Sequence, residues 1–434
     1  MLIKVKKDKL FDQFPPVTTE EWMKKITADL KGADFAKKLI WKTNEGFEVM
    51  PFYRKEDIKN LPFVNILPGQ YPYIRGTKTK NNNWLVRQNI EVADFQAANS
   101  KALFILMKGI DSLGFIISDP GSVSRKNFDT LLKDLNLESI EINFLSNGNA
   151  REILDILLGI KSERCMKAED ISGAVEADPL GRLMMNGTLC VPVEEGFDYL
   201  ASLTANAAGL PNLRTIHLNA GHFRNAGADT VMELAYGLSA ASEYMFQLTD
   251  RGIDAHIAAT KIRFSFGIGP DYFMEIAKLR AARLLWSLVL KGFIPVGCEE
   301  IKMNIHSVTN RWNKTIYDPH VNMLRTQTEA MSAILGGTDS LTVEPFDTVL
   351  RQPDEFSERI ARNQQLILKE EAYFDKVADP AAGSYYIENL TNLIAENSWR
   401  LFVETENLGG FLSALKSGFI QDRLSESAEK RKEE

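Results

Sequence analysis

The chain has 434 residues, of which 44% are hydrophobic and 25% are charged, and this composition is typical of a globular protein with a large core. Its formal net charge of −7 argues against nucleic acid as the main partner, because no basic field covers the chain. No run approaches about 18 consecutive apolar residues, and Cys165, Cys190 and Cys298 are too far apart for a metal motif or a disulfide framework.

The first 45 residues read as an N-terminal arm. They begin without the apolar run of a signal peptide and without the Arg/Ser bias of a transit peptide, so we expect a cytoplasmic protein with no membrane span. A helix is predicted to begin after Thr18 or Thr19, either of which can cap it, and to end near Lys31. Its apolar residues form a one-sided stripe that must dock on this subunit or on a partner. The stripe consists of Trp22, Ile26 and Leu30.

From about residue 84 short β-type runs alternate with longer helical patterns. The predicted strands are 84–90, 114–118, 139–145, 171–176, 215–219, 260–266, 303–308 and 340–343. The helical patterns between and after them include 93–109, 124–135, 150–160, 230–249, 272–290, 322–335 and 356–373. Eight strand–helix units in sequence predict a parallel (β/α)₈ TIM barrel over residues 46–405, in which any active site lies at the C-terminal ends of the strands.

The tail, residues 406–434, contains Gly409-Gly410 and then a stretch of charged and small residues from Ser425 onward. This composition predicts a helical or disordered C-terminal linker.

Four segments have a residue order that is more particular than that of a generic helix or turn. They are RIARNQQLILKEE (359–371), VADPAAGSY (377–385), LGGTDS (335–340) and YFMEIAKLRAAR (272–283). Together they resemble the barrel domain of the methylmalonyl-CoA mutase family, whose members rearrange acyl-CoA skeletons with adenosylcobalamin. The resemblance extends from about residue 15 to about residue 425 and implies the same barrel fold.

In that family a cobalamin-binding domain follows the barrel. Its signature, Asp-x-His-x-x-Gly, occurs nowhere in the 434 residues, so we expect this domain to be absent from the chain. Either the chain is a fragment of a longer one or the subunit works without the domain.

The segment before the first strand, YPYIRG (71–76), also resembles the family. Catalytic members continue with a loop rich in Tyr, Thr, Met and Arg that contacts the CoA tail, whereas here the loop is TKTKNNN (77–83), about three residues shorter. Lys78 and Lys80 could meet phosphate as point charges, and a solvated polar loop is the plainer interpretation.

Several positions of the family's substrate pocket are changed. The segment LVRQN (85–89) keeps Arg87 and Gln88, but Asn89 stands where the family has a tyrosine between substrate and corrin. Glu176 replaces a neutral amide, and Asn186 replaces an arginine that clamps the substrate carboxylate. Removing one partner of a buried charge pair typically costs about 2–5 kcal/mol of binding.

Two histidines and an arginine keep their family positions. His222 matches a histidine that acts as an electrophile on the thioester carbonyl, but its tyrosine neighbour has become Gly221. His306 and Arg263 also match, while NRW (310–312) follows where active members have Thr-Ser-Gly. A lone histidine is more often a structural residue than a catalyst, so we do not expect catalysis by His222.

The scaffold helices keep the resemblance, with charges that could set subunit contacts, while the pocket loses it. The chain is therefore expected to be the barrel portion of a non-catalytic small subunit that pairs with a methylmalonyl-CoA mutase large subunit. It should be inactive alone and bind neither metal nor cofactor, with adenosylcobalamin held by the partner. The vestigial substrate ligands would be Arg87, Gln88, His222, Arg263 and His306. Two alternatives stay open: an active acyl-CoA mutase barrel with a separate cobalamin subunit, as in the isobutyryl-CoA type, and an unrelated barrel enzyme.

Overall fold

A computed structural model describes residues 13–146 and 148–433 of the chain. The chain divides into two compact units, one ending at Tyr53 and the other running from Arg54 to the C-terminus. Within the described residues, no helix combines the length and the apolar character that crossing a membrane requires.

The N-terminal unit contains two short helices and a two-stranded antiparallel sheet. These elements are α1 (Thr19–Asp29), α2 (Phe35–Leu39), β1 (Trp41–Lys42) and β2 (Glu48–Val49). Thr18 caps α1, because its side chain accepts a hydrogen bond from the Glu21 amide while the Glu21 carboxylate accepts one from the Thr18 amide. No residue of α1 is buried, and Trp22 is 46% exposed although it stacks on Phe52. The apolar stripe of the arm is therefore only partly covered.

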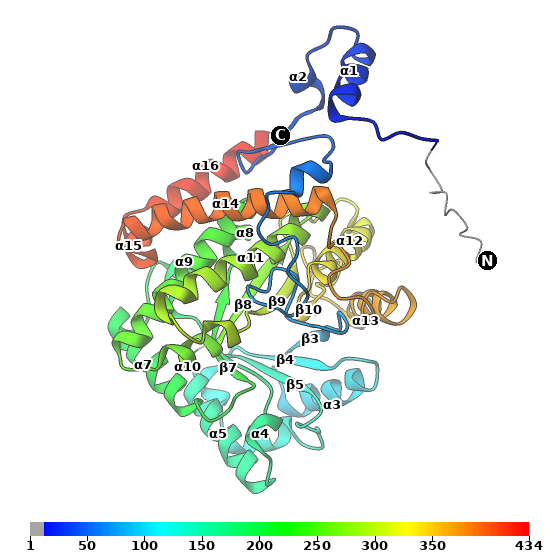
Figure 1. Cartoon of the computed structure of the whole chain (residues 1–434). Coiled ribbons are helices and arrows are strands. Elements are labelled where there is room, and N and C mark those ends of the chain that lie inside the picture. The colour runs from blue at the N-terminus through cyan, green and yellow to red at the C-terminus, as the bar shows by residue number, and fades with distance from the viewer. Residues whose placement is uncertain (1–12, 147, 434) are drawn as a thin grey trace, which may run out of the picture. The chain divides into compact units, whose positions relative to one another are not determined.

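In the second unit eight parallel strands close into a barrel, in the order β10-β3-β4-β5-β6-β7-β8-β9 (Figure 1). The strands are β3 (Leu85–Glu91), β4 (Ser112–Ile117), β5 (Glu141–Ser146), β6 (Gly173–Ala177), β7 (Leu213–Asn219), β8 (Ile262–Ile268), β9 (Asn304–Thr309) and β10 (Ser340–Thr342). Each overlaps one of the eight predicted strands, so the predicted (β/α)₈ barrel is confirmed. All seven residues of β8 are buried, as expected for a parallel strand that is covered on both faces.

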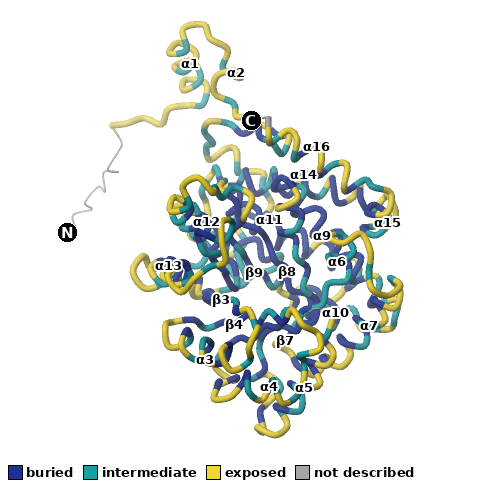
Figure 2. The backbone as a smooth tube through the Cα atoms, turned by 180° about the vertical axis from the view of Figure 1, so that it is seen from behind, coloured by how far each residue is buried: buried dark blue, intermediate teal, exposed yellow. Residues whose placement is uncertain are grey.

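The helices surround the barrel and bury the faces that they turn toward it (Figure 2). The seven predicted helices are all present, as α3 (Phe95–Leu106), α4 (Arg125–Leu131), α5 (Ala150–Glu163), α9 (Thr230–Asp250), α11 (Tyr272–Phe293), α12 (Asn322–Leu335) and α13 (Glu355–Leu366). Further helices are α6 (Pro179–Asn186), α7 (Val193–Asn206), α8 (Gly221–Asn225), α10 (Ala255–Thr260), α14 (Tyr385–Asn407), α15 (Phe411–Lys416) and α16 (Phe419–Glu433). Aspartate side chains accept a hydrogen bond at the first turn of six of these helices, which fixes where they begin. The caps are Asp94, Asp178, Asp229, Asp254, Asp271 and Asp354.

The charges on α11 lie inside the unit and not on a subunit surface. Lys278 contacts the carboxylates of Glu233 at 2.6 Å and Glu275 at 2.5 Å, and all three side chains are fully buried. Arg280 likewise pairs with Glu388 of α14 at 2.9 Å. The idea that these charges set subunit contacts is therefore wrong, because they hold α9, α11 and α14 together.

The segment expected as a linker, residues 406–434, begins in the last turn of α14 and contains the two helices α15 and α16. Gly409 and Gly410 both adopt positive φ and separate α14 from α15. Ile420 and Leu424 are buried, and the Ser427 hydroxyl donates a hydrogen bond to the carbonyl of Gly227 at 2.8 Å. These contacts attach α16 to the loop between α8 and α9.

Candidate functional site

A cavity of about 910 Å³ opens at the C-terminal ends of β4, β5, β6 and β7. Helices α6 and α7 form its outer wall, and this volume lies within the range of small-molecule sites. Its walls are mainly apolar, with Ile116, Ile117, Leu145, Pro179, Met185, Leu189 and Val191. Polar side chains gather where the strands end, namely Glu176, Asp178, His217, Asn219 and His222.

A buried ion pair crosses the barrel interior next to this cavity. Arg87 of β3 reaches Glu176 of β6, with 3.4 Å between its terminal nitrogens and Oε1, although β4 and β5 lie between the two strands. The other oxygen, Oε2, is 2.7 Å from Nδ1 of His217 on β7. Burial alone would raise the pKa of Glu176, but His217 and Arg87 outweigh burial and lower this pKa to about 2. Glu176 is therefore a carboxylate at any physiological pH.

A second arginine crosses the interior nearer the N-terminal ends of the strands. Arg263 of β8 donates to Glu141 of β5 at 2.8 Å, to Asn143 of β5, and to Asn304 of β9 at 2.8 Å. Ser112 of β4 adds a hydrogen bond to Glu141 at 2.9 Å. Burial would raise the pKa of Glu141, but Arg263 and Arg87 hold it below its usual value. Arg263 is thus 2% exposed and fully engaged inside the barrel.

Both ring nitrogens of His306 also make contacts inside the barrel. Its Nδ1 is 2.8 Å from the hydroxyl of Ser340 and its Nε2 is 3.3 Å from that of Thr342, both on the neighbouring strand β10. Burial lowers the pKa of His306 well below its usual value, so the ring is neutral. Between them, Arg87, Arg263 and His306 fill an interior that in most TIM barrels holds branched apolar side chains.

Gln88 lies on the opposite face of β3 from Arg87. Its amide nitrogen donates to Glu358 of α13 at 3.1 Å, and its amide oxygen accepts from Arg362 of the same helix at 3.1 Å. The side chain therefore fastens α13 to the outside of the barrel and does not reach the cavity. This placement follows from the two-residue period of a strand.

Two of the changed positions have a packing explanation. Asn89 accepts a hydrogen bond from Nε of Arg87 at 3.1 Å and lies over Gly114 of β4, where an added Cβ would be only 2.0 Å from its Oδ1. Gly221 begins α8, and a Cβ there would be only 3.0 Å from Oδ1 of Asn219. Both positions therefore lie close to neighbouring atoms.

The remaining predicted residues lie around the cavity. His222 and Asn186 both line it, Asn186 from the exposed C-terminal end of α6. Burial lowers the pKa of His222, which favours a neutral ring. The structure thus places Glu176, Asn186 and His222 at the cavity, with Arg87 behind Glu176, whereas Gln88, Arg263 and His306 lie elsewhere.

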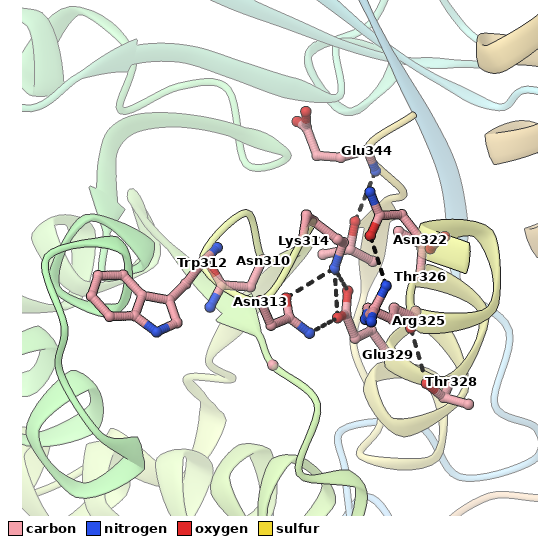
Figure 3. Close-up of polar contacts among 12 residues, drawn as sticks. Asn310, Trp312, Asn313, Lys314, Asn322, Arg325, Thr326, Thr328, Glu329 and Glu344 are labelled. Atoms are coloured by element: carbon pink, nitrogen blue, oxygen red, sulfur yellow. Dashed lines mark hydrogen bonds and ion pairs between the residues drawn. The ribbon is translucent and has the colours of Figure 1, made fainter. Parts of the chain in front are cut away.

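The loop after β9 is held by a compact polar cluster (Figure 3). Lys314 contacts both oxygens of Glu329 on α12 at 2.6 Å, and the amide of Asn313 donates to Glu329 at 2.7 Å. Burial raises the pKa of Glu329 to about 7. The Trp312 side chain points away from this cluster, and the guanidinium of Arg431 lies 5.6 Å from its ring centroid. The segment NRW (310–312), which follows β9, is therefore part of the C-terminal face of the barrel.

The loop 77–83 is hydrogen-bonded to the last turn of α12 and to the segment that leads into β10. Lys78 donates to the carbonyl of Thr338 at 2.7 Å, and Asn82 donates to that of Ile334 at 2.7 Å. Burial lowers the pKa of Lys78. The plainer interpretation, a solvated loop, is therefore wrong for Lys78 and Asn82, while Lys80 is exposed.

Sequence reasoning missed His217, which contacts Glu176 and lines the cavity beside it. The signal was present, since the alternation along β7 puts His217 on the same face as Asn219. It also missed Tyr244, whose hydroxyl donates to Asp178 and whose pKa is raised well above its usual value by burial. Asp178 in turn caps α6, so Tyr244 fixes the outer wall of the cavity.

The comparisons with known proteins agree with one another. A sequence model described as methylmalonyl-CoA mutase matches residues 42–124 and 122–434. The methylmalonyl-CoA mutase small subunit of Porphyromonas gingivalis is 46% identical over 428 residues, covering 98% of this chain and 68% of that protein. The large subunit from the same organism is 30% identical, covering 89% of this chain and 58% of that protein. The methylmalonyl-CoA mutase of Cereibacter sphaeroides is 34% identical, covering 95% and 62%. The chain thus spans between 58% and 68% of the length of these relatives.

Proposed function

The chain belongs to the methylmalonyl-CoA mutase family, and from this premise we propose that it is a non-catalytic small subunit of a two-subunit mutase. In the proposed complex a large subunit interconverts methylmalonyl-CoA and succinyl-CoA with adenosylcobalamin. The present chain pairs with it and supports its fold. A cytoplasmic setting is part of the proposal, in keeping with three cysteines that are all unpaired.

One observation carries the proposal: the barrel interior is closed by two ion pairs that cross it. Arg87 with Glu176 and Arg263 with Glu141 occupy the space between strands that are not neighbours. A CoA thioester lying along the barrel axis would have to displace both pairs. Breaking a buried pair by removing one partner typically costs about 3–5 kcal/mol, so displacement would consume most of the binding energy of a small ligand.

The cavity beside the ion pairs also has no arginine at the family's carboxylate-binding position, although Arg182 lines it elsewhere. Glu176 keeps its negative charge there, and Asn186, which stands at the family's arginine position, is neutral and exposed. A carboxylate such as that of methylmalonyl-CoA would be repelled by Glu176, and Asn186 offers it no bidentate pairing of the kind an arginine makes.

The residues present do not fit an adenosylcobalamin site on this barrel. Asn89, at the family's tyrosine position, is bonded to Arg87 inside the barrel and offers no aromatic surface to a corrin ring. We therefore propose that the cofactor belongs to the partner, and that this chain contributes no group to the radical chemistry.

The proposed partner is a large subunit of the same family. The greater identity to the Porphyromonas gingivalis small subunit, 46% against 30% for the large subunit, supports the small-subunit assignment. Both relatives are named as subunits of methylmalonyl-CoA mutase and come from one organism, which supports a heterodimer.

An active barrel that uses a separate cobalamin-binding subunit is the alternative, and the 910 Å³ cavity favours it. The deciding experiment compares this chain alone, the large subunit alone and the complex, each with adenosylcobalamin and methylmalonyl-CoA. A fourth sample adds a free cobalamin-binding domain to this chain. We expect turnover and bound cobalamin only in samples that contain the large subunit. Turnover above background in the fourth sample would establish the alternative.

A further inference from the structure

We propose that a small cavity beside the loop 77–83 binds one monatomic anion of about the size of chloride. Much of its wall comes from residues that directly precede β3 and β10, so the cavity lies at the N-terminal end of the barrel, opposite to the larger cavity. The inference goes beyond the proposed function, because it concerns neither the mutase reaction nor the partner subunit.

The cavity measures about 10 Å³, which is the space that one water molecule or an ion of similar size needs. Its walls are residues 75–78 and 81–82, Arg283 of α11, residues 335–337 and residues 378–379. An added Cβ at Gly337 would lie 3.4 Å from each terminal nitrogen of Arg283. The guanidinium therefore lies against a part of the wall that has no side chain.

The cations around this cavity outnumber the carboxylates in the described part of the chain. Two arginines and two carboxylates form a balanced group, namely Arg75, Arg280, Asp379 and Glu388. This leaves Asp339 for both Lys78 and Arg283, and Asp339 is 4.0 Å from the Lys78 nitrogen. Arg283 has no carboxylate oxygen within 4.0 Å among residues 13–146 and 148–433. One positive charge is therefore left without a partner.

The same two cations have N–H groups to spare. Arg283 donates to the carbonyls of Tyr73 at 2.9 Å, Gly336 at 2.8 Å and Gly337 at 3.4 Å. A guanidinium has five N–H donors, so carbonyls account for only part of them. The ammonium of Lys78 has three donors, and one of them meets a backbone carbonyl at 2.7 Å. An anion in the cavity would accept the N–H groups that have no acceptor in the described chain.

Loss of hydration makes the extra charge costly. It lowers the pKa of Arg283 to about 10, and it lowers the pKa of Lys78 although Asp339 acts in the opposite direction. Buried charges are stable when they are paired, and an anion would supply the missing negative charge. Asp379 in the wall opposes an anion, but two arginines already pair with it. The bound anion would join the loop 77–83 to α11.

Urea unfolding of the full chain in sodium chloride and in sodium gluconate, at equal ionic strength, tests the proposal in solution, because gluconate is too large for the cavity. At about 200 mM chloride we expect the folding equilibrium constant to be at least about fivefold higher than in gluconate. In Lys78→Met this gain should fall below about twofold. Lys80→Met, at an exposed position in the same loop, should keep the whole gain and so controls for general salt effects.

Crystals soaked in sodium bromide test the position of the ion, since bromide replaces chloride and scatters anomalously. We expect an anomalous peak in the cavity, in contact with Lys78 and Arg283. If Lys78→Met does not fold, the wild-type bromide map decides alone. The proposal is overturned if this map shows no bromide in the cavity, if chloride gives the wild type no gain over gluconate, or if the folded Lys78→Met variant keeps the full gain.

Discussion

Replacing Glu176 by Gln tests whether the ion pair that closes the barrel interior also stabilises it. The substitution keeps the shape of the side chain but removes the charge that faces Arg87 and His217. A pKa of about 2 in place of 4.5 corresponds to about 3 kcal/mol of stabilisation at neutral pH. Removing one partner of a buried pair gives a similar figure of about 3–5 kcal/mol. We therefore expect Glu176→Gln to lower the free energy of unfolding by about 3 kcal/mol.

The pH dependence gives a second measurement of the same effect. Because the folded pKa of Glu176 lies below its unfolded value, the stabilisation is complete above pH 4.5 and is lost as the pH falls toward 2. The difference in unfolding free energy between wild type and Glu176→Gln should therefore be smaller at pH 4 than at pH 7, by about 1 kcal/mol.

Urea unfolding at both pH values measures these differences, and thermal unfolding at pH 7 gives an independent one. For a cooperative unit of about 380 residues the unfolding entropy is about 0.8 kcal/mol/K, so the melting temperature should fall by about 4 °C. Glu163→Gln is the matched control, because the pair of Glu163 with Arg125 lies on the surface. This variant should measurably change neither the urea midpoint nor the melting temperature. The reasoning would be refuted if Glu176→Gln melted at the same temperature as the wild type. It would also be refuted if the difference in unfolding free energy between the two proteins grew toward acid pH.

Four further outcomes are expected. Trp22→Ala should weaken copurification with a large subunit by at least roughly tenfold while leaving the melting temperature of the barrel unchanged; a sharp fall in that temperature with intact partner binding would contradict it. Calorimetry with methylmalonyl-CoA or succinyl-CoA should give weak or no binding, and a micromolar complex would show that the interior opens. Lys278→Met should lower the unfolding free energy by about 3–5 kcal/mol, because it leaves Glu233 buried without Lys278 and Glu275 with Arg224 alone; urea unfolding measures this. Because the folded pKa of Glu329 is about 7, the wild type should lose stability as the pH rises from 4.5 to 7, and Glu329→Gln should lack this loss in urea unfolding across that range.

The barrel was predictable because its strands are short apolar runs between polar turns. Parallel strands buried on both faces favour such runs, and IRFSFGI in β8 is an example. Boundaries were less predictable. The strand predicted from residue 260 begins at Ile262, because Thr260 ends the preceding helix α10. The helices α6 and α7 were not predicted, since Gly and Pro residues interrupt the periodic pattern between them.

The candidate site was only partly predictable. The two-residue alternation along β3 puts Arg87 and Gln88 on opposite faces, and the same alternation along β7 puts His217 on the face of Asn219. Applying this alternation would have excluded Gln88 from the site and included His217. The partners of these side chains could not be read from the sequence. Arg87 and Glu176 are 89 positions apart, and their contact depends on the closure of the barrel. The fastening of Lys78 to the start of β10 is likewise a tertiary contact between distant segments.

The two arginines that cross the barrel also set an order in which the newly synthesised chain can satisfy its buried charges. Arg87 and Glu176 both lie within the first four strands, so this pair can form once β6 has left the ribosome. Glu141 of β5 pairs with Arg263 of β8, which is synthesised later. Until then Glu141 can accept hydrogen bonds from Ser112 and Asn143. The first half of the barrel therefore contains a complete ion pair, Arg87 with Glu176. It also contains Glu141, whose partner Arg263 belongs to the second half. A nascent chain paused between β6 and β8 should accordingly be compact but incomplete, which makes this interval the one in which a chaperone has most to protect.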